Sequence, residues 1–509
     1  MELNQDNRTI CAPLTVLDTV AEQLADVDVT LPDYCPDIEK ILKCTLIPKV
    51  QSRTLSGGQL LIEGYCVVNV LYVESEKKTV RCCEQNVNFS QSFSVRDTSG
   101  SYVIMTKTKS EYINCRALSP RRLVIHGAFS LYAKVIATKT TTLYTPEDEN
   151  LEILKKNIAC SDLKSICQEQ FSVSEEISVA DKPEIESLLY SDVTAYITDA
   201  KAVTGKLMVN GEISLKIFYL TDVESGQTAK LDYILPFSQI IDCEGAEENN
   251  HNIVNCEVLS FDVRLKNDML SDKPAIALDV KLCVTEEGYL PMDEYIITDA
   301  YSTEYATTLA YSDLSMIGET VPVNESCIEK INAKIDNCKI SKLLDIYTDF
   351  ITVDSSVCDD GIKVSGKINL GIIALNEDNY PVFIERSQDY EHLISGAESC
   401  NDFIFGSVRP ASISYRLADA NTIEIRVELK IYGGAVQNES HRSVSNVEVH
   451  EDMPLNTDNC ALMLYFASQG ENLWDIAKAH NTGLDMLMSE NELDNMILEN
   501  QQMLLIPKI

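Results

Sequence analysis

Residues 58–64 read GQLLIEG, and the same pattern returns as GKLMVNG at 205–211 and as DGIKVSG at 360–366. All three fit x-x-[LI]-x-[IV]-x-G. The alternation of apolar and polar residues predicts a strand with one buried face, and each closing glycine leads into a second such run. The closing glycines stand roughly 150 residues apart, the size of an ordinary domain: Gly64, Gly211 and Gly366. The sequence therefore predicts three β-rich repeats in tandem.

Two further landmarks recur around the strand motif, in the same order in each copy. Upstream of it, residues 36–42, 183–189 and 338–344 align. A short helical turn is predicted there, because proline is tolerated in the first turn of a helix and the apolar spacing fits one buried stripe. Downstream, an aromatic residue follows each glycine after 24 to 26 residues: Phe89, Phe237 and Tyr390. We expect the glycines to lie at tight bends or bulges and the aromatic rings to fill cores.

The last fifty residues change from a strand pattern to a helix pattern. Residues 462–466 predict a short strand, Gly470 turns the chain, and Asn472 fits a helix N-cap. Thr482 fits a second N-cap, and residues 503–507 predict a strand closed by proline. The predicted order is therefore strand, helix, helix, strand.

These landmarks divide the chain into five segments. We expect a first repeat with an N-terminal extension at residues 1–160, a second repeat at 161–310 and a third at 311–440. The polar segment 441–459 is predicted to be a linker, and 460–509 a separate small domain. The expected fold class is mainly β, with three tandem β-rich domains followed by a small α+β domain of order βααβ.

The composition excludes several classes of protein. The chain has 79 acidic and 42 basic residues, a formal net charge of −37 at pH 7. Such a field repels nucleic acid phosphates and anionic lipid head groups, so neither is expected as a partner. Hydrophobic residues make up 45% of the chain, which is enough for several cores and excludes wholesale disorder. The first residues lack a signal-peptide pattern and no run reaches membrane-spanning length, so we expect a cytoplasmic protein.

Neither a metal site nor an active site is indicated by a motif. Seventeen cysteines are spread from Cys11 to Cys460 without a C-x-x-C motif, an odd number that suits a reducing compartment. No cysteine spacing joins a histidine set that would complete a zinc site, so free thiols and no metal are expected. H-E-x-x-H, G-x-S-x-G, Walker A and G-x-G-x-x-G are all absent. We therefore expect no enzyme and no cofactor.

The first copy carries a longer signature. Residues 31–42 read LPDYCPDIEKIL and lead into the glycine strand pair. This combination resembles the SPOCS domain of bacterial proteins that assemble the spore coat. The second copy matches well, whereas the third has Cys338 where the others have proline. The resemblance implies a protein of the mother cell cytoplasm that gathers at the forespore surface.

The C-terminal segment resembles a different family. Residues 470–477 read GENLWDIA and residues 501–507 read QQMLLIP, and both are similar to the ends of a LysM module. In that family a shallow groove between the first turn and the loop before the last strand holds N-acetyl sugars. The resemblance places this groove at Gly470, Glu471, Asn472, Asn491, Gln501 and Gln502.

The groove residues depart from the LysM pattern. Glu471 and Asn472 replace the usual Asp-Thr pair, and Gln501 replaces a glycine. Residues 461–509 contain only Lys478 and Lys508 as basic residues, against seven acidic ones, which disfavours anionic wall polymers as ligands. The fold is expected to be kept while the groove is altered.

The two resemblances together imply a non-enzymatic spore coat assembly protein. Its LysM module is then expected to bind the ATPase of the coat basement, stage IV sporulation protein A. The repeats are expected to give multivalent contacts to other coat proteins or to another copy of the chain. We predict the partner contact on the first strand and helix of the module: Leu462, Leu464, Tyr465, Trp474 and Ile476.

The role of Trp474 and the ligand of the C-terminal module each allow two interpretations. Trp474 is the single tryptophan and follows Leu473, so it leaves the core stripe and is predicted to be partly exposed, either for packing or for partner contact. The alternative function is that of a protein of the cell wall or spore cortex that binds peptidoglycan or N-acetylglucosamine. Sedimentation with purified peptidoglycan separates the two functions.

Overall fold

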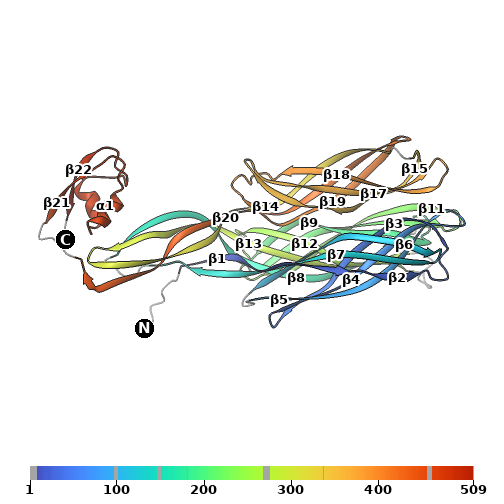
Figure 1. Cartoon of the computed structure of the whole chain (residues 1–509), viewed down its shortest axis with the longest axis horizontal. Coiled ribbons are helices and arrows are strands. Elements are labelled where there is room, and N and C mark those ends of the chain that lie inside the picture. The colour runs from blue at the N-terminus through green and yellow to red at the C-terminus, as the bar shows by residue number, and fades with distance from the viewer. Residues whose placement is uncertain are drawn as a thin grey trace.

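The computed structural model describes residues 8–96, 101–145, 151–179, 182–266, 275–335, 338–455 and 461–507. Strands account for most of these residues, and the two helices lie near the C-terminus, so the mainly β prediction is confirmed. Three β-sandwiches lie side by side in one elongated body, a long arm of strands extends from it, and a small helical module lies at the end of the arm (Figure 1). No helix in the described ranges has the length and apolarity needed to cross a membrane.

The first sandwich consists of two antiparallel sheets packed face to face. In each sheet one strand lies in the middle and pairs on both sides, β4 in one and β7 in the other. Their inward side chains, among them Ile62, Val68, Leu123 and Leu131, form one buried core. The strands are β1 (Thr9–Leu24), β2 (Val27–Thr30), β6 (Tyr102–Ser119) and β7 (Arg122–Thr142) in one sheet, and β3 (Ile38–Ser56), β4 (Gln59–Glu74) and β5 (Val80–Ser94) in the other.

The second and third sandwiches repeat this topology with their own cores. In the second, β8 (Leu151–Ser178), β12 (His251–Lys266) and β13 (Ala275–Ser302) face β9 (Ser187–Val203), β10 (Lys206–Asp222) and β11 (Gln227–Asp242). In the third, β14 (Tyr305–Lys334), β19 (Asp402–Asp419) and β20 (Thr422–Pro454) face β15 (Ile340–Ile351), β16 (Asp354–Cys358), β17 (Gly361–Asn376) and β18 (Pro381–Leu393). The motif strands β4, β10 and β17 are the central strands of equivalent sheets.

The recurring glycine and aromatic residue form a cross-strand pair in every copy. Gly211 lies directly opposite Phe237, as Gly64 lies opposite Phe89 and Gly366 opposite Tyr390. A Cβ atom added at Gly211 would lie 2.5 Å from the Phe237 ring and 2.3 Å from the carbonyl oxygen of Tyr196, on a strand whose register shifts at this point. The ring fills the space that the glycine leaves, so the prediction of bulge glycines and core aromatics is confirmed.

The predicted helical turns upstream of the motif are wrong. Ile38 begins β3, Ser187 begins β9 and Ile340 begins β15, so the apolar residues of these segments follow a strand period. In the first copy the preceding residues form a loop because Arg121 holds it. The Arg121 guanidinium donates to the carbonyl oxygens of Pro32 (2.8 Å) and Cys35 (3.0 Å) and to the Asp37 carboxylate (2.8 Å).

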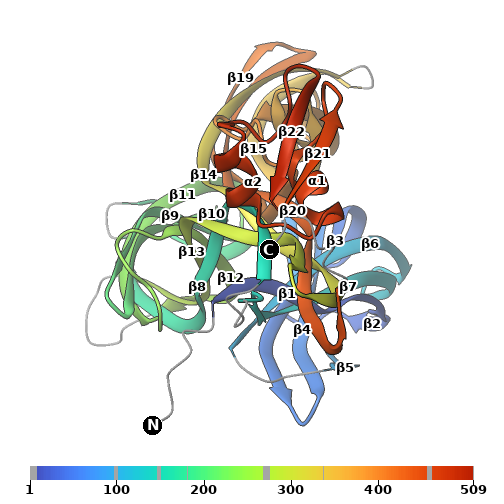
Figure 2. The same ribbon diagram turned by 90° about the vertical axis from the view of Figure 1, so that its left-hand side faces the viewer.

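The three sandwiches pack around a common axis, as the view along the molecule shows (Figure 2). Residues at equivalent positions meet there in two apolar clusters. One contains the residues fourteen positions after the start of β7, β13 and β20: Ile136, Tyr289 and Val436. The other contains the residues seven positions after the motif glycine: Leu71, Phe218 and Ile373. The repeats therefore form one assembly with approximate threefold symmetry and are not strung out.

Two long antiparallel strand pairs extend beyond the sandwiches and form what we call the arm, residues 151–163, 289–317 and 438–454. The first half of β8 pairs with the second half of β13, and the first half of β14 pairs with the end of β20. Residues 441–454 were expected to belong to a linker but form the end of β20, and β8 runs across the expected boundary at residue 160. The many polar residues in this part of β20 predicted a loop, although they alternate as the residues of a strand do. Residues 456–460 lie outside the described ranges.

Candidate functional site

The C-terminal module has the predicted order of strand, two helices and strand. Its elements are β21 (Leu462–Ala467), α1 (Leu473–Ala479), α2 (Leu484–Glu490) and β22 (Gln502–Pro507). Asn472 is the N-cap of α1, as predicted, and its side chain accepts from the amide of Trp474 at 3.0 Å. The predicted cap at Thr482 is wrong. Gly483 precedes α2, and the Thr482 hydroxyl instead donates to the carbonyl oxygen of Pro507 (2.8 Å).

The two strands of the module present an apolar outer surface. In the antiparallel register Leu464 lies opposite Leu505 and Phe466 lies opposite Met503, and Leu462 precedes them on the same side. The side chains of these five residues are between 36% and 72% exposed. We call this set, Leu462, Leu464, Phe466, Met503 and Leu505, the apolar face. Contiguous exposed apolar side chains of this kind mark interaction surfaces more often than isolated ones do.

The apolar face contains only two of the five residues predicted to contact a partner, Leu462 and Leu464. Ile476 is 5% exposed and belongs to the core of the module, so it has no free surface to offer. Tyr465 points to the other side of β21, where its ring meets His480 edge to face at 5.3 Å. Sequence reasoning missed Phe466, Met503 and Leu505. Residues 462–466 are apolar without interruption, so the period of two gave no signal for which side faces outward.

The segments that border the groove predicted from the LysM resemblance are hydrogen-bonded to each other. The Gly470 amide donates to the carbonyl of Leu498 (2.8 Å), and the Leu498 amide donates to the carbonyl of Glu471 (3.0 Å). The Leu473 amide donates to the carbonyl of Met496 (2.8 Å), and a β-bridge joins Asn472 to Ile497. These backbone groups satisfy one another.

The remaining groove residues take structural or surface positions. The Asn491 side chain accepts from the amide of Leu505 and donates to its carbonyl, both at 2.7 Å, and donates to the carbonyl of Leu487 at 2.8 Å. This amide therefore fastens β22 to α2. Gln501 is exposed before β22, and Gln502 begins the strand.

Trp474 is buried against the arm, which corrects the prediction that it is partly exposed. It is 2% exposed, and its ring meets that of Tyr301 on β13 edge to face at 5.0 Å. Its indole N–H donates to Asp299 at 2.8 Å, and Lys478 pairs with both oxygens of the same carboxylate at 2.7 Å. The Tyr301 hydroxyl donates to the carbonyl of Thr482 at 2.7 Å.

This docking depends on an irregularity in the arm. The register between β13 and β8 shifts between Ile297 and Asp299, so a β-bulge turns the Asp299 carboxylate toward the module. Sequence reasoning considered Trp474 only within its own module and therefore could not find a partner 175 residues earlier in the chain.

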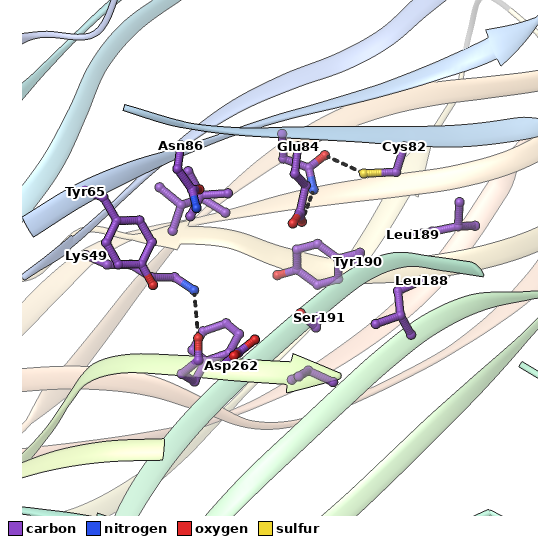
Figure 3. A pocket seen from close by; sticks show the side chains of 15 residues that line it. Lys49, Tyr65, Cys82, Glu84, Asn86, Leu188, Leu189, Tyr190, Ser191 and Asp262 are labelled. Atoms are coloured by element: carbon purple, nitrogen blue, oxygen red, sulfur yellow. Dashed lines mark hydrogen bonds between the residues drawn. The ribbon is translucent and has the colours of Figure 1, made fainter. Parts of the chain in front are cut away.

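A cavity of about 270 Å³ lies between the first two sandwiches (Figure 3). Lys49, Tyr65 and Glu84 line it from one side and Tyr190 and Asp262 from the other. Burial lowers the pKa of Lys49, an effect opposed by the nearby acidic groups. The Lys49 ammonium lies 3.5 Å from the centre of the Phe261 ring and donates to the Phe261 carbonyl at 3.4 Å. These contacts join the two repeats across a polar boundary.

The comparisons with known proteins agree with this architecture. A family model described as SipL, SPOCS domain matches residues 37–118 and 184–266. The matched ranges cover β3 to β6 of the first sandwich and β9 to β12 of the second, which are equivalent strands. The first two sandwiches are thus each similar to a SPOCS domain, in tandem.

Over these two segments the chain is similar to the SPOCS domain of the sporulation-related SipL family. Neither the curated proteins nor the solved structures contain a match. The third sandwich and the C-terminal module lie outside the matched residues. The third sandwich shares the topology of the other two, and the likeness of the module to LysM stays a prediction.

Proposed function

We propose that this chain is a non-enzymatic assembly protein of the spore coat. It acts in the mother cell at the forespore surface and binds stage IV sporulation protein A through its C-terminal module. The observation that carries the proposal is the apolar face, because five exposed apolar side chains share one side of a two-stranded sheet. Leaving them in water has no structural benefit for so small a module, whereas burying them against a partner releases ordered water.

The apolar face points away from the contact that already occupies the module. Trp474 and Lys478 on α1 engage the arm, whereas the exposed side chains lie on β21 and β22. Partner binding and docking to the arm therefore use different sides of the module. The arm can present the module to a partner without first releasing it.

The double variant Leu464→Ser, Phe466→Ser is expected to bind stage IV sporulation protein A at least about tenfold more weakly than the wild type. The reason is that apolar side chains at the centre of an interface dominate its binding energy. The module should stay folded, since both side chains are already exposed. Surface plasmon resonance with the purified full chain measures the affinity, and circular dichroism checks the fold.

The matched control is Met486→Ser, which removes an exposed apolar side chain on α2 and should leave binding unchanged. Unaltered affinity in the double variant would refute this contact.

Peptidoglycan is disfavoured as the ligand by the state of the groove. The amides of Gly470, Leu473 and Leu498 donate to neighbouring carbonyls, so a sugar would have to break these bonds before it could use the same groups. We expect the full chain to show no saturable sedimentation with purified peptidoglycan. Saturable pelleting that is lost on adding N-acetylglucosamine oligomers would favour the wall-binding alternative and sink the partner proposal.

A further inference from the structure

The core of the second sandwich contains a carboxyl group in an unusual setting. Glu286 on β13 is fully buried, and none of the salt bridges of the described residues includes it. One of its oxygens accepts from the Ser165 hydroxyl at 2.8 Å. The other lies 3.2 Å from the Cys243 sulfur and 3.7 Å from the Cys167 sulfur. A carboxyl group this deep is tolerated as a neutral acid or beside a cation, because an uncompensated buried charge is costly.

The three donor groups have the spacing of metal ligands. The two sulfurs and one Glu286 oxygen all lie within 4.8 Å of one another. Zinc binds cysteine sulfur at about 2.3 Å and carboxylate oxygen at about 2.0 to 2.2 Å, so tetrahedral angles place the two kinds of atom about 3.5 Å apart. The observed separations of 3.2 and 3.7 Å fall on either side of that value. These separations are therefore compatible with one ion held by all three groups.

The other two sandwiches show what the fold requires at these positions. Glu286 stands eleven residues after the start of β13, and the residues eleven positions after the starts of β7 and β20 are Ala133 and Gly433. The strand partner of Glu286 is Cys167, whereas Ala133 and Gly433 pair with Thr19 and Val323.

The third potential ligand, Cys243, also stands where the other two sandwiches have a non-ligating residue. The Cys243 amide donates to the carbonyl of the first motif residue, Gly205, and in the first sandwich the Val95 amide makes the same bond to Gly58. In the third sandwich the equivalent residue is Ile394. One residue separates Ile394 from a Gly-Ala-Glu sequence, and one residue separates Cys243 from the same sequence. Both equivalents are buried apolar residues. The second sandwich alone therefore has three potential ligands at positions where the other two sandwiches have non-ligating residues.

We propose that Cys167, Cys243 and Glu286 bind one Zn²⁺ ion inside the second sandwich. Two thiolates and a carboxylate suit zinc, a borderline-soft ion, better than calcium or magnesium, which prefer oxygen ligands only. A water would complete four ligands, and the Ser165 hydroxyl orients the carboxylate through its other oxygen. The ion joins β8 and β13 of one sheet to the chain that leaves β11 of the other, so it cross-links the sandwich. Sequence reasoning expected no metal because the ligands lie far apart along the chain and no histidine takes part.

The test is the zinc content of the full chain, purified under reducing conditions without chelator and dialysed. We expect one zinc ion per chain by mass spectrometry of the metal. The triple variant Cys167→Thr, Cys243→Val, Glu286→Ala copies the first sandwich at all three positions and should lose the zinc while keeping its circular dichroism spectrum. The control Cys44→Ser alters a half-buried cysteine of the first sandwich and should keep the zinc.

Cobalt substitution supplies a second readout. Co²⁺ in the wild-type site should show sulfur-to-cobalt charge transfer and tetrahedral d–d bands, and the triple variant should show neither. Wild-type protein without zinc, a triple variant with wild-type zinc content, or a Cys167–Cys243 disulfide in the reduced preparation would each overturn the proposal.

Discussion

Replacing Trp474 with alanine is expected to lower the free energy of unfolding of the C-terminal module by about 3 to 5 kcal/mol, the usual cost of truncating a fully buried aromatic residue to alanine. The ring is 2% exposed and packs edge to face on Tyr301, so its loss leaves a cavity between the module and the arm. It also leaves the Asp299 carboxylate without one of its donors. Thermal unfolding followed by circular dichroism and calorimetry measures the loss.

A second variant separates unfolding of the module from its release. Asp299→Ala removes the acceptor shared by Trp474 and Lys478 but leaves every side chain of the module core in place. Because Trp474 is the single tryptophan of the chain, its fluorescence reports on this contact alone. We expect the emission of Asp299→Ala to shift to longer wavelength while the helical signal of the module is kept. Unchanged emission would show that the module does not rest on this carboxylate.

These outcomes bear on the proposed partner contact. If Asp299→Ala releases the module and stage IV sporulation protein A still binds with wild-type affinity, Trp474 serves docking and the apolar face serves recognition. If release strengthens binding, the arm covers part of the contact. Trp474→Ala alone cannot distinguish these cases, because loss of binding there would also follow from loss of the fold.

The sequence predicted the repeated elements well because the repeat itself carried the information. The period of two in GQLLIEG and its relatives defined the central strands, and the glycine and aromatic landmarks turned out to face each other across neighbouring strands. The βααβ order of the module followed from Asn472 at the start of a helical stripe. Each of these features depends on neighbours within about thirty residues of the chain.

The contacts that the sequence could not predict join distant segments. Trp474 finds Asp299, and Cys167 finds Cys243 and Glu286, only after the chain has folded into three packed sandwiches. The arm was missed for a related reason. Its strands pair far from a sandwich core, so their residues are more polar than those of β10 or β17, and polar alternation resembles a linker.

Replacing Gly211 with alanine is expected to destabilise the second sandwich by about 3 kcal/mol, at the upper end of the usual cost of overpacking a core. The new methyl group would lie 2.3 Å from the Tyr196 carbonyl oxygen and 2.5 Å from the Phe237 ring. The ring can rotate away, but the carbonyl belongs to the backbone of β9 and can move only if the sheet moves. The loss of stability comes from lack of space for the methyl group and not from backbone strain, since Gly211 has an ordinary extended conformation.

Chemical denaturation of a matched set tests this explanation. Gly396→Ala is the control, because its Cβ meets nothing within 4 Å and its positive φ of 71° costs only about 1 to 2 kcal/mol. Gly366→Ala should be as harmful as Gly211→Ala, since its Cβ would lie 2.0 Å from the Thr352 carbonyl oxygen. That variant probes the third sandwich, which the family model does not reach. If Gly366→Ala were no worse than Gly396→Ala, the glycine and aromatic pair would not be the common structural element of the three repeats.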